Sequence, residues 1–320
     1  MSKPKVAFYW CASCGGCEEA VVDLADDLLA VAAAVEIVLW PVALDFKRAD
    51  VEALPDAAID VAFINGAVRT SEQAEMVHLL RRKSRLVVAF GSCAHLGGIP
   101  GLANLSSRAQ ILATMFHEVP SVDNPDRIQP QPRFNTDLGV LELPSIDETV
   151  KALDQVIEVD YYLPGCAPPP ALVKEAINAI LSGTLPASKS VLAPVKALCD
   201  TCPRRSSKPD KIALKTIRRI ALTDIPADRC FLAEGVICLG PATRTGCGER
   251  CINACMPCRG CFGPVGEVQD QGAKFLSALM SLFEATDAAE IRTIADSVID
   301  PAGLFYMFSL PASLKTKFLE

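Results

Sequence analysis

The chain has 320 residues, of which 50% are hydrophobic and 22% charged, and its formal net charge is -7. This composition supplies enough apolar residues for a core and excludes a disordered chain, while the length favours about two domains. The acidic net charge argues against nucleic acid as the main partner, and no apolar run reaches the roughly 18 residues of a membrane span.

The first predicted element is a buried strand at residues 5–10, a nearly continuous apolar run. Nothing before it resembles a secretion signal, so we expect a cytoplasmic protein whose thiols stay reduced. The turn that follows reads CASCGGCE at residues 11–18, and residues 19–34 have the apolar spacing of a helix. Its cysteines are therefore predicted to lie at the carboxyl end of a strand, where open α/β sheets bind ligands.

Strand-like and helix-like segments alternate up to about residue 185, which predicts a doubly wound α/β domain with a parallel sheet. The strand-like runs are residues 35–40, 59–64, 85–90 and 159–163. Helices are predicted at residues 71–82, with Ser71 as the cap, and from Pro168 to Leu181, with Gly183 ending the helix. Residues 119–145 are rich in proline and polar residues and are predicted to form a long loop that is functional or contacts a partner.

Two of these strand-like runs also end in a cysteine, Cys93 after residues 85–90 and Cys166 after residues 159–163. Because parallel strands end along one edge of a sheet, Cys14, Cys17, Cys93 and Cys166 can converge there. Four thiolates from three loops describe a metal site.

Residues 186–320 differ in character, with few periodic segments other than helical stretches at 271–284 and 288–298. Nine of the fourteen cysteines lie here: Cys199, Cys202, Cys230, Cys238, Cys247, Cys251, Cys255, Cys258 and Cys261. Metal binding is the expected source of order, and eight of these thiols would make two more four-thiolate sites. The alternative is a zinc-stabilised scaffold protein with four-cysteine zinc at Cys199, Cys202, Cys258 and Cys261, which leaves most other cysteines unexplained.

Several short motifs surround the cysteines of the first part: SCGGCE at 13–18, GSCA at 91–94 with GGIPG at 97–101, and LPGC at 163–166. They resemble the proximal-cluster motifs of nickel-iron hydrogenase small subunits. Residues 230–241 and 247–261 resemble the family's distal and medial segments. The resemblance implies a flavodoxin-like domain at 1–185 with the proximal cluster, and an irregular domain at 186–320 with the other two. The related quinone-reducing subunit of respiratory complex I is shorter, has adjacent cysteines in its first motif and lacks the second domain.

Carried over by position, the resemblance implies three 4Fe-4S clusters. Their ligands would be Cys14, Cys17, Cys93 and Cys166 for the proximal cluster, Cys199, Cys202, Cys230 and Cys238 for the distal cluster, and Cys247, Cys251, Cys258 and Cys261 for the medial cluster. Cys251 is favoured because CGERC at 247–251 resembles the cytoplasmic, methyl-viologen-reducing group linked to heterodisulfide reductase. Cys255 departs from that pattern and leaves the fourth medial ligand open. Cys11 has no counterpart and is expected to be a buried free thiol.

The resemblance also implies a function without a catalytic residue in this chain. Dihydrogen would be split at a nickel-iron centre on a separate large subunit, and this chain would relay electrons to an iron-sulfur or flavin acceptor subunit linked to heterodisulfide reductase. Deazaflavin-, NAD(P)- and sulfur-reducing hydrogenases share the proximal motifs and are alternatives. No flavin is expected, because cysteines occupy the sheet edge where flavodoxin-like domains bind one.

Three further features have open interpretations. Glu18 would lie on a proton route beside the large subunit, or simply favour a helix amino terminus. His95 would donate a hydrogen bond to cluster sulfur, or pack without such a role. A basic set falls at helical spacing and would dock an acidic partner or form a solvated face: Lys208, Lys211, Lys215, Arg218 and Arg219.

Overall fold

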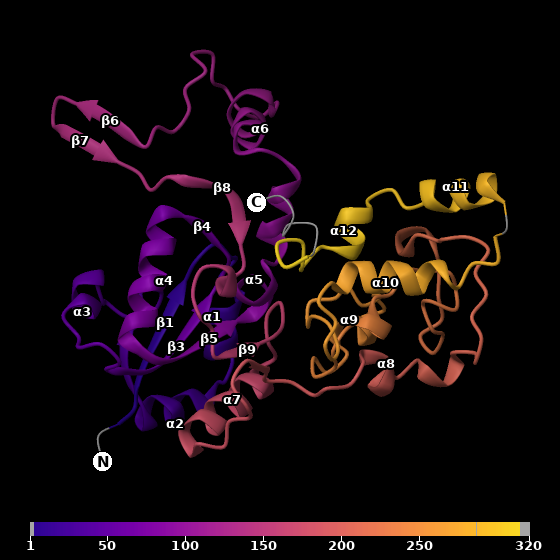
Figure 1. The fold of residues 1–320 in the computed structure, drawn as a ribbon, viewed down its shortest axis with the longest axis horizontal. Coiled ribbons are helices and arrows are strands. Elements are labelled where there is room, and N and C mark those ends of the chain that lie inside the picture. Colours follow the sequence, from indigo (N-terminus) through magenta and orange to yellow (C-terminus); the bar gives the residue numbers. More distant parts are fainter. Residues whose placement is uncertain (1–2, 286, 314–320) are drawn as a thin grey trace.

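A six-stranded parallel sheet organises the first part of the computed structural model, which describes residues 3–285 and 287–313 (Figure 1). Its strands are β1 (Lys5–Trp10), β2 (Glu36–Leu39), β3 (Ile59–Asn65), β5 (Ser84–Phe90), β9 (Tyr161–Leu163) and β10 (Ser190–Val191). They lie in the order β10-β9-β5-β3-β1-β2, and every neighbouring pair is parallel. This is the flavodoxin-like order with one more edge strand, so the predicted fold class is confirmed.

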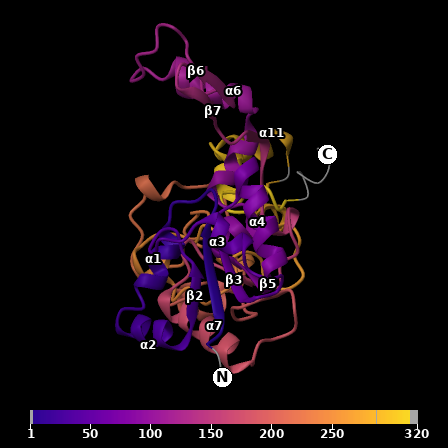
Figure 2. The same cartoon turned by 90° about the vertical axis from the view of Figure 1, so that its left-hand side faces the viewer.

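Helices cover both faces of the sheet (Figures 1 and 2). One face packs against α1 (Gly16–Val22) and α7 (Pro170–Ser182), close to α2 (Asp26–Ala34). The other packs against α4 (Ser71–Lys83) and α5 (Gly91–Leu96), with α3 (Arg48–Glu52) beyond α4. Successive strand residues point to opposite faces, so Phe8 and Phe63 belong to one apolar cluster while Ala7 and Ile64 belong to the other.

Two details of the predicted helices are corrected. The helix predicted over residues 19–34 is two helices, because the chain breaks at residues 23–25, where Ala25 has a positive φ of 51°. Thr70 rather than Ser71 caps α4, and its hydroxyl accepts a hydrogen bond from the backbone N of Gln73 at 3.3 Å. The predicted end of α7 at Gly183 is confirmed.

Residues 107–145 form an arm that extends away from the sheet (Figures 1 and 2). It begins with α6 (Arg108–Ala113) and a π-helical turn (Thr114–Glu118) and ends in an antiparallel hairpin of β6 (Arg133–Thr136) and β7 (Gly139–Glu142). The long loop predicted over residues 119–145 is therefore wrong for residues 133–142, which form a hairpin. Where the arm returns, β8 (Ile146–Lys151) pairs with β4 (Val68–Thr70).

The second part contains short helices and little sheet. They are α8 (Leu198–Thr201), α9 (Arg250–Asn253), α10 (Gln271–Met280), α11 (Ala288–Asp296) and α12 (Pro301–Phe305). The helical stretches predicted at 271–284 and 288–298 are present but shorter. The helical spacing of the basic set is a wrong prediction, because residues 208–219 contain no helix and are held by bridges such as Leu214 to Phe283.

Residues 308–311 pack back onto the first part. The backbone N of Gly98 donates to the carbonyl of Phe308 at 3.1 Å, and the amide of Gln155 donates to the carbonyl of Pro311 at 2.8 Å. The division into two domains at residue 185 stays a prediction. No helix in the described part of the chain combines the length and the apolar run that crossing a bilayer would require.

Candidate metal centres

The proximal quartet, Cys14, Cys17, Cys93 and Cys166, lies at the carboxyl edge of the sheet. Sheet register places Trp10, Asn65, Phe90 and Leu163 in one row across β1, β3, β5 and β9. The chain turns immediately after this row, so the three cysteine-bearing loops start at the same level. Strand register therefore explains how thiols more than seventy residues apart in sequence can meet.

All four thiols of the proximal quartet lie close enough to interact electrostatically in every pair. Burial raises the pKa of Cys93 to about 12, with added contributions from Cys166 and Cys14. Burial also raises the pKa of Cys17, and its three neighbours raise it further. Cys14 and Cys166 are exposed, so the site opens towards the surface. The structure therefore brings these four thiols near one another, and their role as ligands of one cluster stays a prediction.

Two glycines provide the space that these thiols occupy. A Cβ added to Gly91 would lie 2.3 Å from the Sγ of Cys17, and one added to Gly98 would lie 2.4 Å from the Sγ of Cys93. Both glycines have positive φ, at 86° and 57°, a region that costs other residues energy. The Gly-rich segment at 97–101 thus lets the backbone approach Cys93.

Glu18 is fully enclosed beside this quartet. Its carboxylate accepts hydrogen bonds from the indole N of Trp40 and, at 2.7 Å, from the amide of Asn65. Burial raises the pKa of Glu18, and the two hydrogen bonds oppose that rise. Sequence reasoning missed Trp40 and Asn65, although Trp40 follows and Asn65 ends a strand beside β1. Asn65 is polar in an otherwise apolar run, and Trp40 carries an indole N–H.

The distal quartet, Cys199, Cys202, Cys230 and Cys238, surrounds a hollow that its four residues line together. Its thiols also interact in every pair. Burial raises the pKa of Cys199 to about 12 and that of Cys238 to about 11, with smaller contributions from the other thiols. The Lys208 ammonium lies at the hollow and lowers the pKa of Cys199 in opposition.

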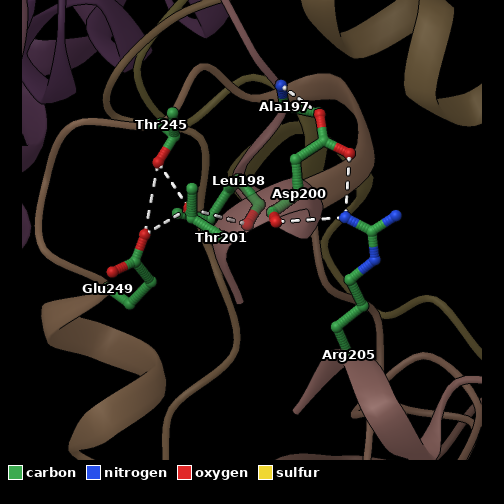
Figure 3. Close-up of polar contacts among 7 residues, drawn as sticks. All are labelled: Ala197, Leu198, Asp200, Thr201, Arg205, Thr245 and Glu249. Carbon is green, nitrogen blue, oxygen red and sulfur yellow. Dashed lines mark hydrogen bonds and ion pairs between the residues drawn. The ribbon is translucent and has the colours of Figure 1, made fainter. Parts of the chain in front are cut away.

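Polar contacts join α8, which carries Cys199, to Thr245 and Glu249 on either side of Cys247 (Figure 3). The hydroxyl of Thr201 donates to the carboxylate of Glu249 at 2.5 Å and contacts the hydroxyl of Thr245 at 2.7 Å. On the other side of α8, Arg205 donates to Asp200 at 3.5 Å, and Asp200 accepts from the backbone N of Ala197 at 3.1 Å. These contacts fix two cysteine-bearing segments relative to each other without regular structure.

The remaining cysteines form a medial group in which Cys261 has a central place. Cys261 interacts electrostatically with Cys247, Cys251 and Cys258, and burial raises its pKa to about 12. Cys255 has a different surrounding. The guanidinium of Arg204 donates to its Sγ at 3.5 Å, and Arg204 is itself only 2% exposed.

Arg204 is a buried cation that sequence reasoning did not single out. It lies 4.1 Å above the ring of Phe231 and donates to the carbonyls of Pro226 and Arg229, both at 2.9 Å. Its position directly after Cys202 and Pro203 did not indicate that it is buried, because arginine is usually exposed and the partners of Arg204 are distant in sequence.

The three groups touch one another in the order proximal, medial, distal. The thiol of Cys261 lies near that of Cys166, whose charge raises its pKa, and this proximity links the proximal quartet to the medial group. The backbone N of Cys258 donates to the Sγ of Cys238 at 3.3 Å, which links the medial group to the distal quartet. A continuous line of cysteines therefore runs from the sheet edge into the second part.

The donor chemistry of these groups fits iron-sulfur clusters. Thiols that raise one another's pKa cannot all ionise unless a bound cation compensates their charge, and thiolates are the ligands of iron-sulfur clusters. In the two quartets the structure gathers four thiols, the number that a four-iron cluster requires. Within residues 3–285 and 287–313, no three His, Cys, Asp or Glu side chains are arranged around the position of a single ion.

Two other predicted residues have clear positions. The ring of His95 packs against that of Tyr162 at 4.7 Å, and burial followed by the charge of Arg244 lowers the pKa of His95 to about 3. The packed interpretation of His95 is thus supported. Cys11 lies in the apolar cluster beneath the sheet at 5% exposure, which confirms the prediction of a buried thiol.

Comparison with known proteins gives a family match and relatives of full length. Residues 14–180 match the family described as NADH ubiquinone oxidoreductase, 20 Kd subunit. The iron-sulfur subunit of an F420-non-reducing hydrogenase from Archaeoglobus profundus is 36% identical over 316 residues, which cover 98% of each chain. A vhu subunit of the F420-non-reducing hydrogenase from Methanocaldococcus jannaschii is 36% identical over 310 residues, covering 97% of this chain and 96% of that protein.

A solved structure supports the fold. The recombinant [NiFeSe] hydrogenase of Desulfovibrio vulgaris Hildenborough aligns with a TM-score of 0.52 at 16% identity, over 82% of this chain and 94% of that chain. The fold resemblance therefore reaches beyond residue 180, where the family match ends, and into the cysteine-rich part.

Proposed function

The chain belongs to the family of hydrogenase small subunits, and from this membership we propose that it relays electrons through three four-iron clusters in a cytoplasmic nickel-iron hydrogenase. As a hydrogenase subunit it is part of an oxidoreductase. Small subunits of this kind carry iron-sulfur clusters and pair with a large subunit that holds the nickel-iron site. The number of clusters and the acceptor are the proposed parts.

The contact between the three cysteine groups is the observation that supports a relay. Electrons can pass between separate centres only where the protein brings them near one another. Here the Cys166 and Cys261 thiols lie close enough to interact electrostatically, and the backbone N of Cys258 donates to the Sγ of Cys238. Clusters held there would supply one-electron carriers in series. The proximal quartet opens to the surface at Cys14 and Cys166, a suitable face for the large subunit.

The residues around each group would hold the clusters and limit contact with water. Gly91 and Gly98 leave room for the thiols of Cys17 and Cys93, and Phe231 with Leu232 lines the distal hollow. The sulfur of Cys238 accepts a backbone N–H, which stabilises negative charge on that ligand and thereby raises the reduction potential of what it binds.

Cys251 is the fourth medial ligand in this proposal, rather than Cys255. Cys251 interacts electrostatically with Cys261, whereas Cys255 accepts a hydrogen bond from Arg204. Cys255 also has a positive φ of 56°, which fixes it in a tight turn after α9. The choice between the two exposed thiols rests on these different partners, Cys261 for Cys251 and Arg204 for Cys255.

We propose heterodisulfide reductase as the destination of the electrons, through an iron-sulfur or flavin acceptor subunit. The full-length relatives are named for not reducing F420, a deazaflavin, which supports this destination over a deazaflavin. NAD(P)- and sulfur-reducing partners stay alternatives. A cytoplasmic location fits fourteen thiols that must stay reduced to bind iron. We propose no flavin in this chain and a domain division near residue 185.

Metal analysis of the complex purified without oxygen tests the proposal. We expect about twelve irons per copy of this chain, matching sulfide, and nickel carried by the larger polypeptide. Zinc with little iron would contradict the relay and support a zinc-stabilised scaffold. Cys251→Ala should lower the iron count and change the electron paramagnetic resonance signal of the medial centre, whereas the matched Cys255→Ala should retain both. The reverse pattern would assign Cys255 as the ligand.

A further inference from the structure

The segment between the two halves of the distal quartet carries a concentrated positive charge. Residues 203–219 contain seven cationic side chains and one carboxylate, in a chain whose net charge is -7. Apart from the buried Arg204, the cationic residues are exposed: Arg205, Lys208, Lys211, Lys215, Arg218 and Arg219. We call this set the basic segment. A local cluster of positive charge on a protein of negative net charge attracts and orients partners of negative charge.

The basic segment begins at the distal quartet itself. Lys208 lines the hollow between the four distal thiols, and its charge acts directly on Cys199. The segment lies on the side of the second part that faces away from the sheet, after α8 (Figure 1). The basic segment is therefore remote from the proximal quartet and close to the distal quartet, the last of the three cysteine groups.

Few of these charges are neutralised within the chain. Lys211 lies 3.5 Å from Glu284, but the two side chains are 85% and 67% exposed, so the pair is weak. Arg205 lies 3.5 Å from Asp200. Lys208, Lys215, Arg218 and Arg219 form no ion pair with a described residue. Most of the charge is thus available to a molecule that approaches the distal quartet.

We propose that the basic segment is the docking surface for a redox protein whose contact face is acidic. This proposal rests on the relay function and identifies the chemistry of the acceptor. The carrier gains one electron, the centre held by the distal quartet loses one, and two carriers are reduced for each dihydrogen, whose two protons leave at the large subunit. The segment increases the rate of encounter by electrostatic attraction.

The test measures reduction of carriers of opposite charge by dihydrogen, using the complex of this chain with its large subunit. The probes are an acidic plant-type ferredoxin, a basic c-type cytochrome and methyl viologen, a small dye that needs no docking face. With the wild-type complex we expect ferredoxin reduction to slow steeply as salt rises, because screening removes the attraction. A ferredoxin rate that is flat or rises with salt would overturn the proposal without any variant.

A charge-reversal variant provides the second measurement. Lys211→Glu, Lys215→Glu and Arg219→Glu together should lower kcat/KM for ferredoxin tenfold or more at low salt and raise it for the cytochrome. Lys208 stays unchanged because it lines the distal hollow, and so does Arg218, whose guanidinium donates to the carbonyl of Glu234 at 3.4 Å. Methyl viologen reduction and iron content should remain at the wild-type level.

A matched control reverses three exposed cations far from the distal quartet, Lys47, Arg82 and Lys189. This control has the same net charge, so an equal loss of ferredoxin reduction would show a whole-protein charge effect and overturn the assignment of the surface. The relay function fails separately: a wild-type complex that cannot reduce methyl viologen with dihydrogen would refute the relay. Normal viologen reduction without a preference for ferredoxin would refute only the docking surface.

Discussion

Replacing Gly91 by alanine should remove the proximal cluster while leaving the fold in place. Gly91 is the first residue of α5, directly after β5, and its φ is 86°. An added Cβ would lie 2.3 Å from the Sγ of Cys17 and 3.3 Å from the carbonyl O of Gly165. The change therefore acts on a proposed cluster ligand from a neighbouring loop without altering any cysteine.

The size of the effect follows from these distances. Atoms in ordinary contact are about 3.5–4.0 Å apart, so the Cys17 sulfur must move by about 1 Å or more. Side chains that bind a metal or take part in catalysis tolerate displacements of only about 0.5 Å. The energetic cost combines about 1–2 kcal/mol for a left-handed alanine with about 1–3 kcal/mol for overpacking.

Iron analysis with electron paramagnetic resonance measures the outcome. Gly91→Ala should lose about four of twelve irons and the signal of the proximal centre, while the signals of the other two remain. Gly183→Ala is the matched control, because Gly183 has a φ of 67° and its added Cβ would meet nothing within 4 Å. That control should cost about 1 kcal/mol and no iron. Full iron content with an unchanged proximal signal in Gly91→Ala would refute the reasoning.

Three further predictions concern groups that the structure places around the metal centres. Arg204→Met removes two hydrogen bonds from a buried guanidinium to backbone carbonyls and should lower the free energy of unfolding by about 3 kcal/mol or more. The measurement is a lower thermal midpoint, with Arg204→Lys less affected, and an unchanged midpoint would contradict this. Glu18→Gln should retain iron but slow exchange between dihydrogen and solvent protons if the carboxylate carries protons; unaltered exchange would leave Glu18 a structural partner of Trp40. Removing iron with chelator should make residues beyond about 190 sensitive to protease while the sheet resists, whereas equal resistance of both parts would argue against metal-dependent order.

The strands and the proximal quartet could be predicted from sequence because their signals are local. A buried parallel strand is a continuous apolar run, and each of the runs ending before Cys11, Gly91 and Pro164 forms a strand of the sheet. Parallel direction then determines that their ends share one edge, so convergence of Cys14, Cys17, Cys93 and Cys166 follows without further information. The same local reasoning failed for residues 208–219, where the cations fall at helical spacing but the chain is not helical. Ile212 and Leu214, two residues apart, are both buried, which a single helix face would not achieve.

Contacts between segments distant in sequence were decided only by the tertiary structure. Arg204 reaches Pro226 and Cys255, and Trp40 and Asn65 enclose Glu18, yet none of these residues has a local pattern that names its partner. Between Cys199 and Cys261 the chain has little helical or strand periodicity, and its course depends on single hydrogen bonds such as that from Cys258 to Cys238. The sequence alone thus determines where regular elements end and which cysteines follow them. Which thiols face one another in an irregular region depends on long-range packing, because periodicity carries no information about it.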